Sequence, residues 1–254
     1  MNRVNAPDGT PLVYDVYEPL PPTGRARAAV LFLHDWYPRT EGLAERWTRA
    51  GTELRDAGIA AYFLDQRGHG RSGGMRGHLS RFSQLLGDLQ TFRSAVRHRL
   101  DAPQILVGQG FGGLVVLRYL ETQPGEPPAA AVVTNPWLMP RGRVATWKRV
   151  AAKLADLWPT LPTGRGDAFM TAGARAELQW ARRAILADCA RIERPLLVML
   201  GGRDPMSDAE RARDFATKLA PPADVCWYEE EGHELLDRES AIHDLIDFIQ
   251  QHRS

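Results

Sequence analysis

A glycine-rich turn in the middle of the chain has the spacing of a nucleophile elbow but lacks the nucleophile. Residues 105–114 are Ile-Leu-Val-Gly-Gln-Gly-Phe-Gly-Gly-Leu, an apolar stretch followed by a turn and a helical pattern. In Gly-x-Ser-x-Gly the serine attacks an acyl carbon, and the glycines permit a sharp strand-to-helix turn. Gly108 and Gly112 are present, and Gly110 stands where the serine is expected. The turn predicts an acyl-transfer site without its attacking hydroxyl.

Two residues downstream have the types and the order of the acid and base that such a site needs. Asp204 follows an apolar run and two glycines, and His233 follows another apolar run and an acidic loop. The chain order of nucleophile, acid and histidine is typical of this elbow. Either residue alone would more simply be a turn or capping residue. Together, behind the glycine-rich turn, they predict an orienting acid (Asp204) and a general base (His233).

The elements that would position these residues alternate along the chain. Apolar, β-branched runs are separated by amphipathic helical patterns, which predicts a mostly parallel sheet flanked by helices. The later runs are almost continuously apolar, as expected for strands covered on both faces. The predicted strands are residues 12–17, 28–33, 59–64, 105–107, 129–134, 195–200 and 225–228, and the predicted helices between or after them include 41–57, 82–100, 209–219 and 240–252.

One region interrupts this alternation. Between residues 135 and 194 there is no strand pattern, but two helical patterns, 146–158 and 172–192, flank a turn-rich segment. We interpret 135–194 as a helical cap inserted into a core domain formed by 1–134 and 195–254, placed over the edge of the sheet where active sites lie. An apolar, aromatic entrance for a hydrophobic substrate and simple packing of the cap are equally good explanations of its tryptophans. These are Trp137, Trp147, Trp158 and Trp180.

Composition limits the class of protein and its partners. The chain has 254 residues and a net charge of +1, so bulk electrostatics indicates neither a nucleic-acid partner nor a membrane surface. No stretch approaches the roughly 20 apolar residues of a membrane span, and residues 1–10 carry no apolar secretory segment. Cys189 and Cys226 are isolated and lack metal-ligand spacing, which favours a reducing, cytoplasmic location. The oligomeric state is not indicated.

The motifs together resemble the α/β-hydrolase superfamily and, within it, the monoacylglycerol lipase and lysophospholipase group. The resemblance implies an α/β fold with a mostly parallel eight-stranded sheet and a small helical cap. It also implies hydrolysis of small hydrophobic or lipid-like carboxylic esters, with no cofactor and no metal. The matching segments are Leu33-His34-Asp35-Trp36, Asp65-Gln66-Arg67-Gly68-His69-Gly70-Arg71-Ser72, Gly77-His78, the elbow at 108–113, Gly202-Arg203-Asp204 and Gly232-His233-Glu234-Leu235-Leu236.

Two departures from the group coincide in the predicted site. Gly110 replaces the nucleophile, and Asp35 stands where the group has the glycine of a His-Gly pair. By resemblance, the backbone N–H groups of Trp36 and Phe111 are the oxyanion donors. We expect His34, Gln109 and the four tryptophans of the predicted cap to line the substrate pocket. A carboxylate at Asp35 would repel an oxyanion if it pointed into that hole. Alternatively, Asp35 faces solvent or caps a loop.

Three functions are compatible with the sequence. The first is an ester hydrolase framework in a nucleophile-less form, in which Gly110→Ser alone is expected to restore ester cleavage. The second is another base-catalysed enzyme that uses His233 and Asp204, with Asp35 as a further acid or base. The third is a binding protein that keeps the pocket without the chemistry. Loss of the side chain at 110 is expected to leave room for about one water molecule beside His233.

Overall fold

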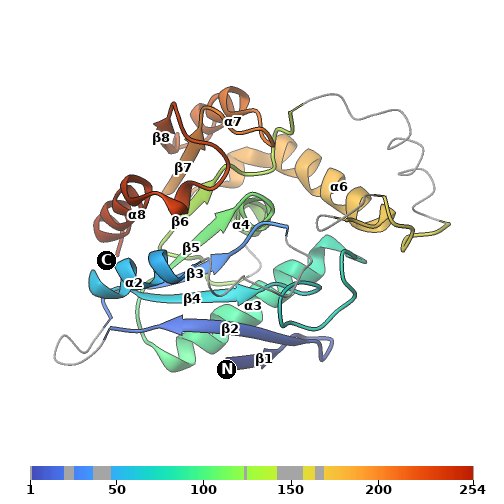
Figure 1. Ribbon diagram of the computed structural model, residues 1–254, viewed down its shortest axis with the longest axis horizontal. Coiled ribbons are helices and arrows are strands. Elements are labelled where there is room, and N and C mark those ends of the chain that lie inside the picture. Colours follow the sequence, from blue (N-terminus) through green and yellow to red (C-terminus); the bar gives the residue numbers. More distant parts are fainter. Residues whose placement is uncertain are drawn as a thin grey trace.

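The strands form a single sheet in the computed structural model, which describes residues 2–19, 26–36, 47–122, 125–141, 157–163 and 169–253. The strand order is β1-β2-β4-β3-β5-β6-β7-β8 (Figure 1). Among the described strands, the pairings of β1 with β2 and of β2 with β4 are antiparallel, and the others are parallel. The strands are β1 (Asn2–Asn5), β2 (Pro11–Tyr17), β3 (Ala29–Leu33), β4 (Ala60–Asp65), β5 (Gln104–Gln109), β6 (Ala130–Thr134), β7 (Leu196–Gly201) and β8 (Asp224–Tyr228).

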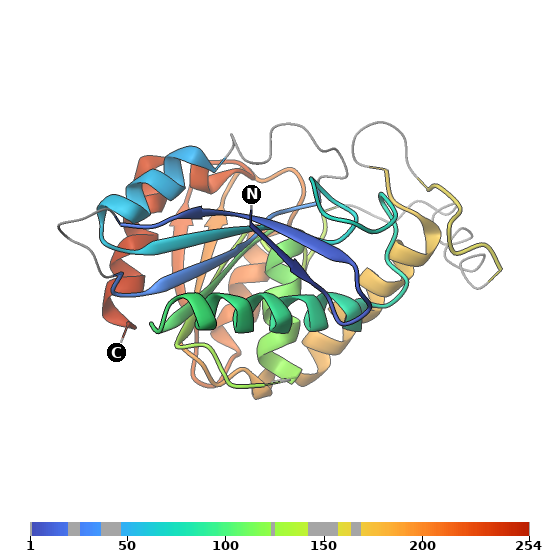
Figure 2. The ribbon, with the colours of Figure 1, turned by 90° about the horizontal axis from the view of Figure 1, so that it is seen from below.

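Helices cover both faces of the sheet, which is why its central strands are buried at every position. One apolar cluster joins one face to α2 (Thr48–Asp56) and α8 (Glu239–Gln251). Figure 2 shows these two helices on the side of the sheet opposite α3 and α4. The second cluster joins the other face to α3 (Phe82–Arg99), α4 (Phe111–Thr122), α6 (Ala172–Asp188) and α7 (Ala209–Thr217).

The sheet brings the carboxyl ends of its parallel strands to one edge, where ligands bind in open α/β sheets. β3 and β5 are direct neighbours, and Leu33 pairs with Gly108. Two residues beyond this pair, Asp35 and Gly110 leave the two strands side by side. The same edge receives the loops after β6, β7 and β8, so the register of the sheet assembles the site.

The predicted α/β architecture is confirmed, with two differences in detail. All seven predicted strands are present, and β1 is an additional edge strand that pairs with β2. The helix predicted at 172–192 ends at Asp188 and continues as a short 3₁₀ turn, Cys189–Arg191. Most of the predicted helix 146–158 and the beginning of the predicted helix 41–57 lie outside the described residues. Among the described helices, none has the length and apolar composition to cross a bilayer.

Candidate active site

Gly110 occupies a sharp turn between β5 and α4. Its φ angle is +51°, a left-handed conformation that costs a residue with a side chain roughly 1–2 kcal/mol. Close packing explains the nearby glycine at 112, because a Cβ there would lie 2.1 Å from the carbonyl oxygen of Leu33. Because Gly112 has no Cβ, the first turn of α4 can pack directly against the end of β3. The backbone N–H of Phe111 therefore faces the loop that carries Asp35.

The carboxylate of Asp35 fills the space between the elbow and His233. Its Oδ1 accepts hydrogen bonds from the backbone N–H groups of Trp36 and Phe111, both at 2.7 Å. These are the two predicted oxyanion donors. Its Oδ2 lies 2.7 Å from Nε2 of His233. Asp35 is only 3% exposed, so of the two orientations left open by the sequence, the structure has the one that points into the predicted hole.

The space expected beside His233 for a water molecule is therefore occupied, and this expectation was wrong. A Cβ built on Gly110 would lie 2.3 Å from both Cγ and Oδ1 of Asp35. Atoms without a bond between them do not approach so closely. A serine at 110 and an aspartate at 35 thus compete for one volume, and Gly110→Ser alone no longer suffices as a test of acyl-transfer chemistry.

His233 lies between two carboxylates. Nδ1–H donates to Oδ2 of Asp204 at 2.9 Å, while Nε2–H donates to Asp35. Asp204 is fully buried, and its Oδ1 accepts from the backbone N–H of Met206 at 2.7 Å. Burial by itself lowers the pKa of His233, but the hydrogen bonds and the negative charges of Asp204 and Asp35 outweigh it and raise the pKa to about 10. Near neutral pH, the ring is an imidazolium.

Asn135, which the sequence reading did not single out, holds the histidine loop in place. It follows β6 with a φ of +43°, and its buried side-chain amide donates to the carbonyls of Gly232 (3.0 Å) and His233 (2.9 Å). Its Oδ1 accepts from the backbone N–H of Gly201 at 2.9 Å. An asparagine at the end of a buried strand was the available signal, since Asn tolerates positive φ better than most residues.

Segment 65–72 supports the other side of the site, by holding the backbone of the loop that carries Asp35. The backbone N–H of Gln66 donates to Nε2 of His34 at 3.0 Å, and its side-chain amide donates to the His34 carbonyl at 2.7 Å. The ring of His69 lies edge-on to that of Trp36, with centroids 4.7 Å apart. Burial lowers the pKa values of both histidines. His34 is 1% exposed and is a structural support for the loop rather than an open pocket wall.

Two of the predicted pocket residues lie next to the elbow. Gln109 is fully buried, and its side-chain amide donates to the carboxylate of Glu234. The backbone N–H of Trp137 donates to the carbonyl of Gly110 at 3.0 Å. The Trp137 indole N–H is buried and has no hydrogen-bond partner among the described residues. These residues connect the elbow to the loops after β6 and β8.

The other predicted tryptophans are not brought together with the elbow. Trp158 is 61% exposed and Trp180 is 53% exposed. The guanidinium of Arg118, on α4, lies 4.9 Å from the centre of the Trp180 ring, on the outer surface. The alternation pattern could not distinguish an outward-facing helical tryptophan from one facing inward. Trp147 lies outside the described residues.

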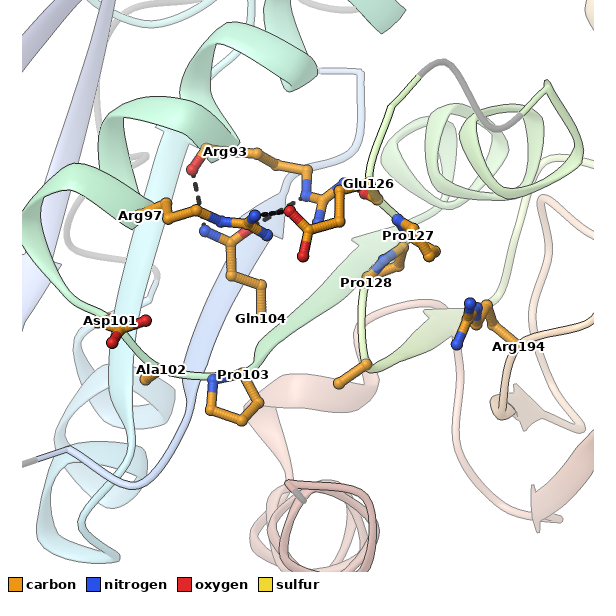
Figure 3. Close-up of a pocket in the computed structure, with 11 residues that line it drawn as sticks. Arg93, Arg97, Asp101, Ala102, Pro103, Gln104, Glu126, Pro127, Pro128 and Arg194 are labelled. Carbon is orange, nitrogen blue, oxygen red and sulfur yellow. Dashed lines mark hydrogen bonds and ion pairs between the residues drawn. The ribbon is translucent and has the colours of Figure 1, made fainter.

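A separate polar hollow lies at the opposite edge of the sheet. It has a volume of about 520 Å³ and is lined by residues at the amino ends of β5 and β6 and by α3. Arg93 donates to Gln104 at 3.0 Å, and Arg97 forms an ion pair with Glu126 (Figure 3). The hollow lies at the amino ends of β5 and β6, whereas the site around His233 lies at the carboxyl ends of the parallel strands. In the described ranges, no cluster of His, Cys, Asp or Glu could hold a metal ion.

The eight-stranded, mostly parallel sheet and the elbow between β5 and α4 define an α/β-hydrolase. Residues 24–182 match the family described as serine aminopeptidase, S33. The chain belongs to this family, and its framework is that of the esterase and monoacylglycerol lipase-like hydrolases.

Named relatives agree with this assignment. A monoacylglycerol lipase of Mycolicibacterium smegmatis is 33% identical over 162 residues, which is 63% of this chain and 55% of that protein. The match therefore spans about half the length of that relative. The solved monoacylglycerol lipase of Paleococcus ferrophilus has a TM-score of 0.77 at 20% identity, covering 95% of this chain and 99% of that one. The monoglyceride lipase of Saccharomyces cerevisiae has a TM-score of 0.82 at 16% identity, covering 100% and 95%.

Proposed function

We propose that this chain is a monoacylglycerol lipase-like hydrolase in which acyl transfer is blocked by its own Asp35. The observation that carries the proposal is the carboxylate itself, bound to Trp36 N–H, Phe111 N–H and His233 at 2.7 Å each. In an acyl-transfer site, those three groups serve the substrate oxyanion and the nucleophile. Here one side chain satisfies all of them.

The residues at positions 35 and 110 depart from the resembling group together. The resembling group has glycine at the first position and serine at the second, and this chain has aspartate and glycine. The side chain that faces His233 therefore follows β3 in this chain, whereas in the resembling group it follows β5. The carboxyl ends of these two strands are neighbours. Because a Cβ at 110 would overlap the carboxylate, an aspartate at 35 in this orientation requires a glycine at 110. In this proposal, Asp204 and His233 act as orienting acid and general base once Asp35 is removed and a serine stands at position 110.

The natural substrate class of the restored site would be a small hydrophobic or lipid-like ester. The names of the relatives from Mycolicibacterium and Paleococcus support this class, and Trp137 supplies a partly buried apolar surface beside the elbow. Division into a core and a cap at 135–194 remains part of the proposal. The second hypothesis, general-base catalysis by the His233–Asp204 pair alone, is disfavoured near neutral pH because the raised pKa of His233 keeps its ring protonated.

The test is to reverse both substitutions. Four proteins are compared on p-nitrophenyl butyrate and octanoate: the natural chain, Asp35→Gly, Gly110→Ser and the double variant. We expect only the double variant to cleave esters, with a gain of at least roughly a thousandfold over the natural chain, since removing a triad member costs at least that much. Only there are the hydroxyl, the free N–H groups and a neutral His233 present together.

Two controls make the result interpretable. Adding His233→Ala to the double variant must abolish the gained activity, and circular dichroism must show that all the proteins are folded. Full activity in Gly110→Ser alone would contradict blocking by Asp35. A folded but inactive double variant would contradict the hydrolase site itself and would leave a non-catalytic binding role, the third hypothesis, as the better explanation.

A further inference from the structure

We propose that the polar hollow at the amino ends of β5 and β6 binds a small aliphatic dicarboxylate. The hollow has a volume of about 520 Å³, which is within the range of small-molecule sites. It lies at the edge of the sheet opposite the candidate active site, so its test does not involve ester hydrolysis. The charged residues of its lining are three arginines and two acids, Arg93, Arg97, Arg194, Asp101 and Glu126. This positive excess favours an anionic ligand.

The central observation is a buried positive charge without a negative partner. Arg93 is 4% exposed, and among the described residues its side chain donates only to uncharged groups. Its Nε donates to Oε1 of Gln104 at 3.0 Å, and its Nη1 donates to the hydroxyl of Tyr119 at 2.7 Å. Nη1 also donates to the backbone carbonyl of Glu126 at 2.5 Å. Because burial of an unpaired charge is costly, a carboxylate in the hollow would stabilise this arginine.

The other arginine that is buried among the described residues shows the usual arrangement. Arg67 is 8% exposed, and its guanidinium forms ion pairs with Asp88 at 2.5 Å and with Asp8 at 2.8 Å. Arg93 has similar burial but no such pair, and its Nη2 has no hydrogen-bond partner within the described ranges. Since Arg93 lines the hollow, Nη2 is the donor that remains for a ligand carboxylate.

The guanidinium of Arg93 is already held in place by its neighbours. Gln104 accepts from its Nε and donates a side-chain N–H to the Arg93 carbonyl at 2.9 Å. The hydroxyl of Tyr119 donates in turn to Gln90, and Cζ of Arg93 lies 5.3 Å from the centre of the Tyr119 ring. A donor that is fixed before binding loses little conformational freedom when the ligand arrives, which favours affinity.

Arg97 supplies a second donor at the same end of the hollow, where it now binds Glu126. These two side chains form an ion pair and are 44% and 66% exposed (Figure 3). An exposed ion pair contributes little to stability, so a ligand carboxylate would replace that of Glu126 at small cost. Arg93 and Arg97 are four residues apart on α3 and therefore lie on the same side of the helix. One carboxylate can thus be shared by both arginines.

Arg194 lies at the other end of the hollow, and this separation favours a ligand with two anionic groups. In Figure 3, Pro127 and Pro128 lie between Arg194 and the other two arginines, and no interaction joins Arg194 to the rest of the lining. A dicarboxylate such as succinate or glutarate has one anionic group for each end and a short apolar chain to lie against the prolines. Inorganic phosphate has its charge in one place and would leave one end without a partner.

The test is isothermal titration calorimetry of the natural chain with glutarate at constant ionic strength. Succinate, butyrate and inorganic phosphate are titrated in parallel. We expect one of the two dicarboxylates to bind with a dissociation constant below about 1 mM. Butyrate, which has a single carboxylate, should bind at least roughly tenfold more weakly. No binding of either dicarboxylate up to about 10 mM would overturn the site. Equal binding of butyrate, or tighter binding of phosphate, would overturn the choice of a dicarboxylate.

Variants locate the binding in the hollow. Glu126→Gln removes the competing carboxylate and should tighten binding roughly threefold or more, whereas Arg97→Gln and Arg194→Gln should each weaken it roughly tenfold or more. Arg93→Lys keeps the buried charge but lacks the planar guanidinium, and it should weaken binding at least as much. Because Arg97 and Arg194 are on the surface, their variants decide the question even if Arg93→Lys does not fold. Arg49→Gln, which removes another exposed, ion-paired arginine, should bind as the natural chain does. Equal binding by all of these proteins would overturn the assignment.

Discussion

Adding a single methyl group at position 110 should be far less tolerable with Asp35 present than without it. Gly110→Ala introduces a Cβ that would lie 2.3 Å from the Asp35 carboxylate. Displacing a packed group costs roughly 1–3 kcal/mol, in addition to about 1–2 kcal/mol for a side chain at a φ of +51°. We expect the free energy of unfolding to fall by about 2–5 kcal/mol in the natural background and by about 1–2 kcal/mol in Asp35→Ala.

The assay is a double-mutant cycle by urea denaturation. The coupling free energy between the two positions is expected to be about 1–3 kcal/mol. Gly58→Ala is the matched control, because Gly58 also has a positive φ, +77°, but a Cβ there would meet nothing within 4 Å. Its cost should be the same with and without Asp35. Additivity of the Asp35 and Gly110 substitutions within about 0.5 kcal/mol would refute the claim that the two side chains share one volume.

Other predictions concern the groups around this pair. An NMR titration of His233 should show an imidazolium up to about pH 10, and Asp35→Asn should lower that midpoint. Because the folded pKa lies above the usual 6.5, this stabilisation is complete below pH 6.5 and is lost as the pH rises through about 10; urea midpoints of the natural chain should fall over that range more steeply than those of Asp35→Asn. Asn135→Ala should cost about 1–3 kcal/mol in urea denaturation by leaving buried backbone groups unpaired. Gly112→Ala should lower the free energy of unfolding by about 3 kcal/mol or more, which is the upper end of the range for overpacking a core. Trp180→Ala should lower it by less than about 1 kcal/mol in thermal or urea unfolding, because the ring is half-exposed.

Much of the fold could be predicted because burial leaves a periodic trace in the sequence. Strands covered on both faces, such as those at 130–133 and 196–200, are continuously apolar. β1, the strand that the sequence pattern did not predict, has the sequence Asn-Arg-Val-Asn and alternates between half-buried and exposed positions. An edge strand with one covered face and polar side chains gives too little pattern to recognise. Its pairing with β2 is visible only in the three-dimensional structure.

In the candidate site, the order of the residues along the chain could be predicted from the sequence, but the orientation of their side chains could not. The strand–turn–helix motif and the order of Asp204 and His233 predict a contact that the structure has, at 2.9 Å. The outward position of Trp180 and the role of Asn135 depend on how loops and helices pack, which residue types do not specify.

The sequence by itself determined that this chain is an α/β-hydrolase with a glycine in place of a nucleophile, because these properties belong to local motifs and to the hydrophobic pattern. Only the tertiary structure decided where the Asp35 carboxylate points. The parallel pairing of Leu33 with Gly108 places residues 35 and 110 opposite each other, and two N–H donors and His233 then bind the carboxylate. Side-chain direction at a strand end follows from such contacts between distant segments. The sequence lacks a serine side chain at position 110, and in the folded protein the carboxylate of Asp35 occupies that space.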